Sequence, residues 1–280
     1  VERRVNMRPK HNTIALIYDF DGTLSPKSMH EYTFFPEAGI GSEDFWVNVE
    51  KQNRRYEADS VLTYMRLMIE KAEEKKYALT RSRFNLMAKK MKYFKGVETY
   101  FSRVNHYVRK KFPGVEVRHY IISAGIKEIL EAVSVRKHFY NIFASEFFYG
   151  KDGRAVFPNI AINDTAKTQY IFRINKGREK QHESINEHMP QDKRKIPFEN
   201  MLYIGDGLTD VPCMTLVRGN GGHSIAVHSS KEGRDTCRLL LDAGRVDFIA
   251  KADYSSGSEL DKLIRISLDA ICSGIKLKTA

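Results

Sequence analysis

The residues with the clearest chemical potential are two aspartates in the stretch 14–24, which reads IALIYDFDGTL. Five apolar or aromatic residues lead without a break into Asp19 and Asp21, a pattern typical of a strand that is buried on both faces. The carboxyl end of such a strand is where open α/β sheets bind ligands. Two carboxylates at that point could hold a hard divalent cation such as Mg²⁺ or act on one reacting group.

The pair Asp21 and Gly22 also permits a plainer interpretation. An Asp-Gly pair between apolar runs is a strong hairpin signal, and the aspartates would then be turn residues without a chemical role. Further polar residues at the ends of later predicted elements favour the first interpretation.

A second predicted strand, at residues 117–122, runs into Ser123, Ala124 and Gly125 and is followed by an amphipathic helix. A strand, a turn of small residues and a helix form the βα unit of a parallel sheet. The hydroxyl of Ser123 and the amides of Ala124 and Gly125, expected at a helix N-terminus, could bind an anion. Ser123 could also be a simple N-cap, and the two roles are compatible.

A later predicted strand, at residues 201–204, ends in the sequence GDGLTD, which contributes Asp206 and Asp210. Lys167 begins a predicted helix that closes at Lys176. Because the strands of a parallel sheet all end at one edge, these groups can converge from distant parts of the sequence. Two alternatives stay open: Asp210 could be only the N-cap of the next helix, and Lys176 could replace Lys167. We favour Lys167 because it lies at the helix start.

These motifs, in this order, resemble the haloacid dehalogenase-like hydrolase superfamily, and most of all its phosphatases with a helical cap, similar to phosphoserine phosphatase. The resemblance covers about residues 13–25 and 96–230, whereas residues 26–95 match only in being helical and in their place. In this family an aspartate two residues after the nucleophile, here Asp21, is typical of phosphatases and phosphotransferases. Dehalogenases and phosphonatases lack it.

The resemblance implies a role for each motif. Asp19 would attack phosphorus to give an aspartyl-phosphate, Asp21 would act as general acid and base, and Lys167 would supply positive charge. Mg²⁺ would be held by Asp19, the backbone carbonyl of Asp21 and Asp206, with Asp210 as a further ligand or water holder. The residues expected to bind phosphate are Ser123, Ala124, Gly125, Gly22 and Thr23.

The expected fold class is α/β, a Rossmann-like three-layer core with a parallel sheet and an inserted all-helical cap. The predicted division is core at 1–25, cap at 26–96 and core again at 97–280. Ser42 is the expected N-cap of the first long cap helix. Apolar residues at helical spacing predict the cap helices: Phe45, Trp46 and Val49; Val61, Met65, Met68 and Ala72; Phe84, Met87, Met91 and Phe94.

Composition sets broad limits on partners and location. The net charge of +11 favours anionic partners such as phosphorylated metabolites or nucleic acid, although a basic solvated surface explains it equally well. The polar residues 1–12 are expected to form a frayed lead-in. No apolar run approaches the roughly 20 residues of a membrane span, and the start lacks the apolar core of a signal peptide. Cys213, Cys237 and Cys272 lack metal-ligand spacing, so we expect reduced thiols and a cytoplasmic protein.

The sequence therefore predicts a Mg²⁺-dependent phosphatase whose cap excludes water and favours a small phosphorylated metabolite over nucleic acid. A phosphotransferase with the same intermediate, or a nucleotide or nucleic-acid phosphatase, is the alternative. A non-enzymatic binding module is disfavoured because every catalytic position is filled. Neither the metabolite nor the oligomeric state follows from the sequence. Five cap residues could contact a substrate or only form a solvated helix face: Arg54, Arg55, Tyr56, Tyr64 and Arg66.

Overall fold

The computed structural model describes residues 11–279, so the predicted lead-in at 1–12 lies almost wholly outside the described residues. A seven-stranded sheet has the order β4-β3-β2-β1-β5-β6-β7, and all neighbours pair in parallel except β3 and β4. This confirms the Rossmann-like α/β fold. The strands are β1 (Thr13–Tyr18), β2 (Glu116–Ile126), β3 (Phe139–Tyr149), β4 (Ala155–Ile160), β5 (Met201–Gly205), β6 (His223–His228) and β7 (Phe248–Lys251).

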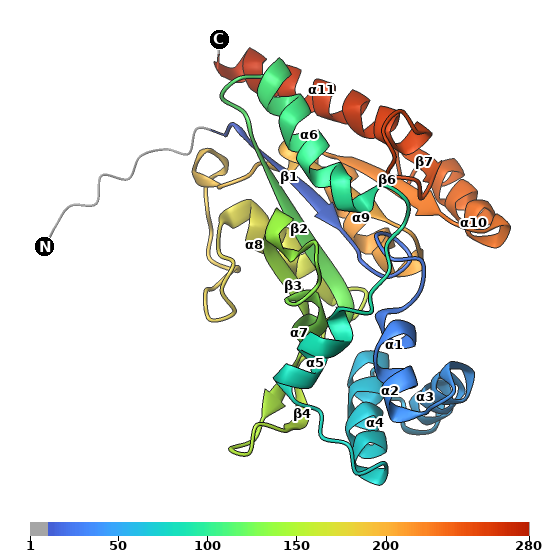
Figure 1. Cartoon of the computed structure of the whole chain (residues 1–280). Helices are drawn as coiled ribbons and strands as arrows, with labels where there is room; N and C mark the ends of the chain where they lie inside the picture. Colours follow the sequence, from blue (N-terminus) through green and yellow to red (C-terminus); the bar gives the residue numbers. More distant parts are fainter. Residues whose placement is uncertain (1–10, 280) are drawn as a thin grey trace, which may run out of the picture.

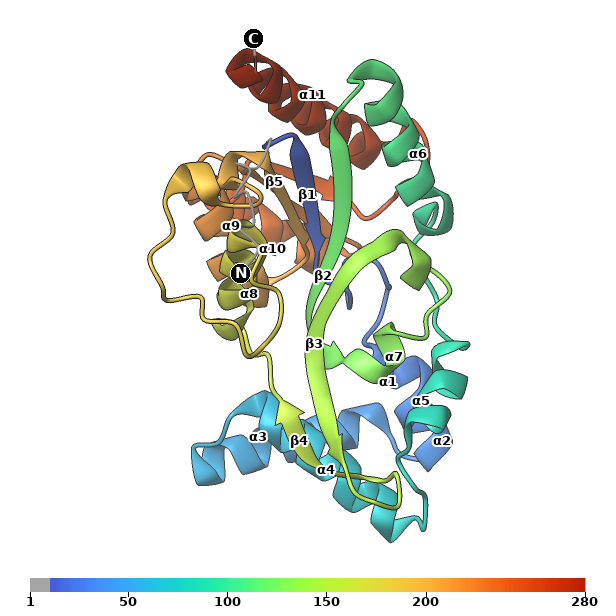
Figure 2. The ribbon, with the colours of Figure 1, turned by 90° about the vertical axis from the view of Figure 1, so that its left-hand side faces the viewer.

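Helices cover both faces of the sheet, as Figure 2 shows, with α6 and α11 on one side and α8, α9 and α10 on the other. Strand β1 is buried along its whole length because its side chains alternate between the two layers. Leu16 packs into the layer of α6 and α11, and Ile17 into the layer of α8 and α9. The core helices are α6 (Val97–Lys111), α7 (Lys127–Leu130), α8 (Ala166–Lys176), α9 (Val211–Gly219), α10 (Lys231–Asp242) and α11 (Glu259–Thr279).

The segment between β1 and α6 is helical, as predicted, and Figure 1 shows α1 to α4 grouped at one end of the sheet. Helix α4 packs against β4, and α5 packs against α7. The amide of Phe94 donates to the carbonyl of Leu24, so the two connections to the core lie side by side. The division at 26–96 stays a prediction. The helices are α1 (Met29–Tyr32), α2 (Phe34–Ala38), α3 (Ser42–Tyr56), α4 (Ser60–Glu74) and α5 (Arg81–Ala88).

The capping of these helices differs from expectation at one point. Ser42 is the first residue of α3 rather than its N-cap, and Gly41, which has no side chain to accept a hydrogen bond, occupies the N-cap position. Helix α4 has the cap that α3 lacks: the carboxylate of Asp59 accepts from the amides of Val61 and Leu62.

Gly96 joins the helical segment to α6 and permits a close backbone contact. Its φ of 86° is in the left-handed region, and a Cβ atom would lie 2.4 Å from the amide nitrogen of Ser255. The amide of Tyr254 donates to the carbonyl of Lys95 beside this contact. Only glycine therefore allows the chain to enter α6 against the segment that precedes α11.

We expect Gly96→Ala to lower the free energy of unfolding by about 3 kcal/mol, since left-handed strain and a clash with backbone add together. Gly153→Ala is the matched control, because its φ is 77° but nothing lies within 4 Å of the added Cβ. Its loss should be about 1 kcal/mol. Urea unfolding of both variants measures the difference, and equal losses would show that the Ser255 contact is unimportant.

Candidate active site

The aspartates converge at the carboxyl edge of the sheet. Asp19 follows β1 and Asp206 follows β5, and these strands are parallel neighbours, so both side chains reach one point. Asp210 joins them from the turn before α9. Carboxylate oxygens of Asp19, Asp206 and Asp210 lie within 4.8 Å of one another.

The turn after β1 approaches Asp206 closely because Gly22 has no side chain. Gly22 has a φ of 79°, and a Cβ there would lie 2.1 Å from Oδ2 of Asp206. Its amide donates to the carbonyl of Ser25, and the buried hydroxyl of Thr23 donates to Oδ1 of Asp206. These groups support the turn and Asp206, and the expected contact of Gly22 and Thr23 with phosphate stays a prediction.

Lys167 lies at the centre of the cluster, on the first turn of α8. Its ammonium donates to Oδ1 of Asp19 at 2.9 Å and to Oδ1 of Asp210 at 2.8 Å, and the side chain is 2% exposed. Burial alone would lower the pKa of Lys167, but the charges of Asp19 and Asp210 outweigh it and raise that pKa. Lys176, at the far end of α8, instead donates to the carbonyls of Ile185 and Glu187.

Asp210 is fully buried and accepts three hydrogen bonds. Lys167 and the hydroxyl of Tyr203, at 2.7 Å, donate to Oδ1, and the amide of Asp206 donates to Oδ2. Asp210 occupies the N-cap position of α9, but its side chain makes no capping bond. The alternative that Asp210 is only a helix N-cap is therefore wrong. Tyr203 was not predicted from the sequence as a site residue, because there it is one aromatic residue inside an apolar strand.

Asp21 connects the site to the first helix after β1. Its Oδ1 accepts from the backbone amide of Met29 at 2.9 Å, at the start of α1. Burial and the charge of Asp19 raise the pKa of Asp21 well above its ordinary value. A protonated carboxyl group beside a carboxylate is the arrangement that a general acid needs.

The segment at Ser123 differs from expectation. Strand β2 continues through Ile126, and the pairing register with β3 shifts between Ile122 and Ile126, as in a β-bulge. The amides of Ala124 and Gly125 therefore belong to a bulged strand and not to a helix N-terminus. Helix α7 begins only at Lys127 and has four residues.

Ser123 is buried within this bulge. Its Oγ accepts from the amide of Gly125 at 3.0 Å, so Ser123 stabilises the bulge rather than capping a helix. The predicted turn and helix N-terminus at 123–125 are wrong because pairing with the long strand β3 keeps these small residues extended. Their expected contact with phosphate stays a prediction.

The crowded carboxylates suit a divalent cation. Burial and the charges of Asp19 and Asp210 raise the pKa of Asp206 to about 8. Burial and the charge of Asp210 likewise raise the pKa of Asp19 to about 6, although Lys167 opposes this. The donors are all oxygen atoms, and a hard cation such as Mg²⁺ would relieve their repulsion. Asp19, Asp206 and Asp210 therefore fit a magnesium site.

Comparison with known proteins agrees with this geometry. A model of the haloacid dehalogenase-like hydrolase family matches residues 16–215. The chain belongs to this family. It is also 30% identical to an uncharacterized protein of Borreliella burgdorferi, over 96% of this chain and 100% of the relative.

Solved structures of the family share the fold. A phosphoserine phosphatase with an analogue of its phospho-aspartyl intermediate matches with a TM-score of 0.57 and 15% identity, over 91% of this chain and 98% of that one. A HAD family hydrolase from Salmonella enterica matches with a TM-score of 0.56 and 17% identity, over 84% and 71%. The family match confirms the resemblance to haloacid dehalogenase-like hydrolases, and these structures share the fold of this chain.

None of the helices in the described part of the chain is long and apolar enough to cross a bilayer.

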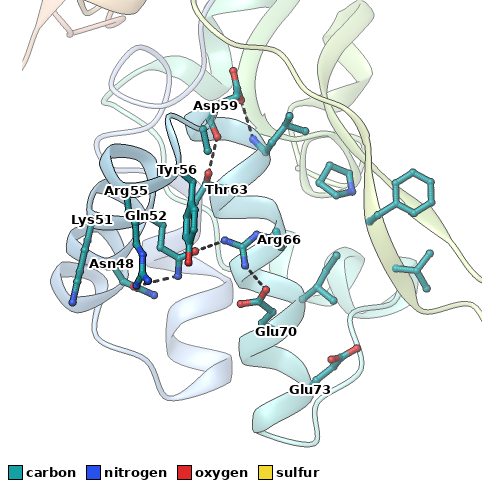
Figure 3. Close-up of a pocket in the computed structure, with 16 residues that line it drawn as sticks. Asn48, Lys51, Gln52, Arg55, Tyr56, Asp59, Thr63, Arg66, Glu70 and Glu73 are labelled. Atoms are coloured by element: carbon teal, nitrogen blue, oxygen red, sulfur yellow. Dashed lines mark hydrogen bonds and ion pairs between the residues drawn. The ribbon is translucent and has the colours of Figure 1, made fainter.

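A cavity of about 1180 Å³ lies away from the aspartates, between α3, α4 and β4 (Figure 3). Arg55, Tyr56 and Arg66 line it, and Arg66 bonds to Gln52 and Glu70. The cavity is thus separate from the aspartate cluster, although it contains three of the five cap residues singled out in the sequence.

The raised pKa values predict how stability depends on pH. A carboxyl group whose folded pKa lies above its unfolded value contributes stability that is complete below the unfolded pKa and is lost as pH rises to the folded pKa. Without divalent cations, the free energy of unfolding should fall between about pH 4, the unfolded pKa of an aspartate, and about pH 8, the folded pKa of Asp206, by up to about 1.4 kcal/mol per pH unit for each group. Mg²⁺ should flatten this slope by binding the ionised folded state. Denaturant titrations with and without Mg²⁺ measure it, and Asp206→Asn should have a shallower slope in the absence of metal.

The two lysines of α8 give a second test. Lys167→Met leaves the carboxylates of Asp19 and Asp210 buried without their cation, so we expect at least a hundredfold loss of hydrolytic activity. Lys176→Met removes only bonds to loop carbonyls and should keep activity within about twofold. Steady-state rates on a generic phosphate monoester decide the question, and the reverse order of effects would contradict the assignment.

Proposed function

We propose that this protein hydrolyses phosphate monoesters of small metabolites through a phosphorylated Asp19, with Mg²⁺ as cofactor. The observation that carries the proposal is the buried contact of Lys167 with both Asp19 and Asp210, beside Asp206 and the raised pKa of Asp21. Unaided hydrolysis of these esters is so slow that the protein must lower the barrier by on the order of 20 kcal/mol or more. Positioning and charge neutralisation supply most of that.

The first half of the reaction uses Asp19 and Asp21. A carboxylate oxygen of Asp19 attacks phosphorus in line, and the bond from phosphorus to the ester oxygen breaks. Asp21 donates its proton to the departing oxygen, so the leaving group departs as an alcohol. Lys167 holds Asp19 in place and offsets negative charge next to the phosphoryl group.

The second half restores the enzyme. Asp21, now ionised, takes a proton from water as the water attacks phosphorus, and the bond from phosphorus to Asp19 breaks to release inorganic phosphate. When bound by Asp19, Asp206, Asp210 and the carbonyl of Asp21, Mg²⁺ would neutralise the charge between carboxylate and phosphate dianion. The bulge at 123–125 would contact the remaining phosphoryl oxygens.

One observation supports a small substrate, and another supports a location of the protein in a reducing compartment. Helices α1 and α4 reach the site, because the amide of Met29 donates to Asp21 and the hydroxyl of Tyr64 donates to the carbonyl of Ala124. A helical cover of this kind suits a small substrate better than a macromolecule. The free cysteines are Cys213, Cys237 and Cys272, all buried, which suits the cytoplasm.

Asp19→Asn tests the proposal directly. With a panel of phosphorylated metabolites and Mg²⁺, we expect phosphate release by the unchanged protein and at least a thousandfold loss in the variant, or about 4 kcal/mol, because the amide is a poor nucleophile. Asp164→Asn, at an exposed aspartate before α8, is the matched control and should keep full activity.

Residual activity of Asp19→Asn within tenfold of the control would exclude Asp19 as nucleophile. Added alcohols distinguish the alternative of a phosphotransferase, which would pass the phosphoryl group to them in competition with water. Hydrolysis confined to nucleotides or oligonucleotides, with a steep dependence on salt, would instead favour the nucleic-acid alternative.

A further inference from the structure

The bulge that follows Ile122 is bonded by two side chains of the helical segment 29–88. The carbonyl of Ala124 accepts from the hydroxyl of Tyr64, on α4, at 2.5 Å. The amide of Ile126 donates to the sulfur of Met29, on α1, at 3.1 Å. Two backbone groups, one in the expected phosphate-binding segment and one directly after it, are therefore satisfied by side chains of the helical segment.

The carbonyl of Ala124 is also hydrogen-bonded to the core. It accepts a second bond, from the hydroxyl of Ser145 on β3, at 3.0 Å, and that same oxygen of Ser145 accepts from the amide of Ile162. Ile162 lies in the loop that leads to Lys167. A displacement of Ala124 would therefore be transmitted to the loop before the catalytic lysine.

Helix α4 reaches that loop a second time through its own N-cap. The Oδ2 atom of Asp59 accepts from the amide group of Asn163 at 2.8 Å, while Oδ1 caps α4. Asn163 in turn accepts from the amides of Ala166 and Lys167 at the start of α8. Figure 3 shows Asp59 at the beginning of α4, bonded to its first turn. One helix thus contacts both the bulge and the start of α8.

The ring of Tyr64 is fixed independently of its hydroxyl. It is 4% exposed and makes edge contacts with His30, at 5.1 Å between centroids, and with Trp46, at 5.8 Å. Burial raises the pKa of the Tyr64 hydroxyl, so it stays a proton donor at all ordinary pH values. Removing the oxygen alone would leave this packing in place.

We propose that Tyr64 and Asp59 are positioning residues: helix α4 sets the geometry of the bulge and of the start of α8, so that the phosphoryl site is complete only with α4 docked. Neither residue touches the reacting atoms. The inference rests on the proposed phosphatase function for its kinetic consequence, but its structural consequence is independent of that function.

The test compares Tyr64→Phe with Tyr93→Phe. Tyr93 is a matched control: its ring packs against Phe20, as it would after the substitution, whereas its hydroxyl accepts from Ser134 at 3.0 Å and not from the bulge. In Tyr64→Phe we expect kcat to fall about tenfold with KM within about twofold, because misplaced groups cost most in the transition state. Orthovanadate, a mimic of that state, should inhibit about tenfold more weakly. Tyr93→Phe should change none of these values.

Hydrogen exchange gives a readout without catalysis. The amides of Gly125 and Ile126 should exchange at least tenfold faster in Tyr64→Phe than in the parent or in Tyr93→Phe. Asp59→Asn retains an N-cap for α4 but loses one acceptor, so it should speed exchange at Ala166 and Lys167 instead.

Unchanged exchange at Gly125 and Ile126 in Tyr64→Phe would overturn the proposal. A loss of kcat that follows a fall in the unfolding temperature, and vanishes on cooling, would also overturn it by showing a purely structural role. If the parent releases phosphate from no substrate, the proposed function fails, and faster exchange in Tyr64→Phe would still support the positioning role.

Discussion

The constraint on which the rest of the structure depends is the concentration of carboxylates at one sheet edge. Asp19, Asp206 and Asp210 are brought together by adjacent parallel strands, and like charges at that separation repel. The buried ammonium of Lys167 offsets part of this charge, and Tyr203 donates to Asp210 from within β5. Together with burial, the remaining negative charge keeps the pKa values of Asp19 and Asp206 high, and the cluster of oxygen atoms suits a hard cation.

This constraint explains the local sequence around the site. Glycine at position 22 lets the turn after β1 pass against Asp206, where any side chain would collide. Thr23 then donates to Asp206, and the hydroxyl of Tyr254 donates to the carbonyl of Thr23 from the segment before α11. The loop that carries Asp19 and Asp21 is thus held from the core side by Thr23 and Tyr254.

The helical segment is part of the site and not only a cover for it. Met29 bonds both to Asp21 and to Ile126, while Tyr64 bonds to Ala124. These contacts join Asp21 and the bulge at 123–126 to the helical segment 29–88. The side chains that bond to Ala124 and Ile126 come from α4 and α1, so the helical segment and the sheet edge are physically coupled through them.

The sequence by itself determined the parallel core, the helical insertion and the positions of the aspartates, because these depend on local apolar periodicity and on short motifs at strand ends. It also indicated Lys167 over Lys176, since a helix start in this fold faces the sheet edge. Only the tertiary structure decided the conformation at 123–126. There β2 continues as a bulge because it pairs with β3, a long-range partner that no local pattern reveals. The bonds of Tyr203 and Tyr64 were hidden for the same reason: a buried tyrosine looks apolar in sequence until the acceptor of its hydroxyl is known.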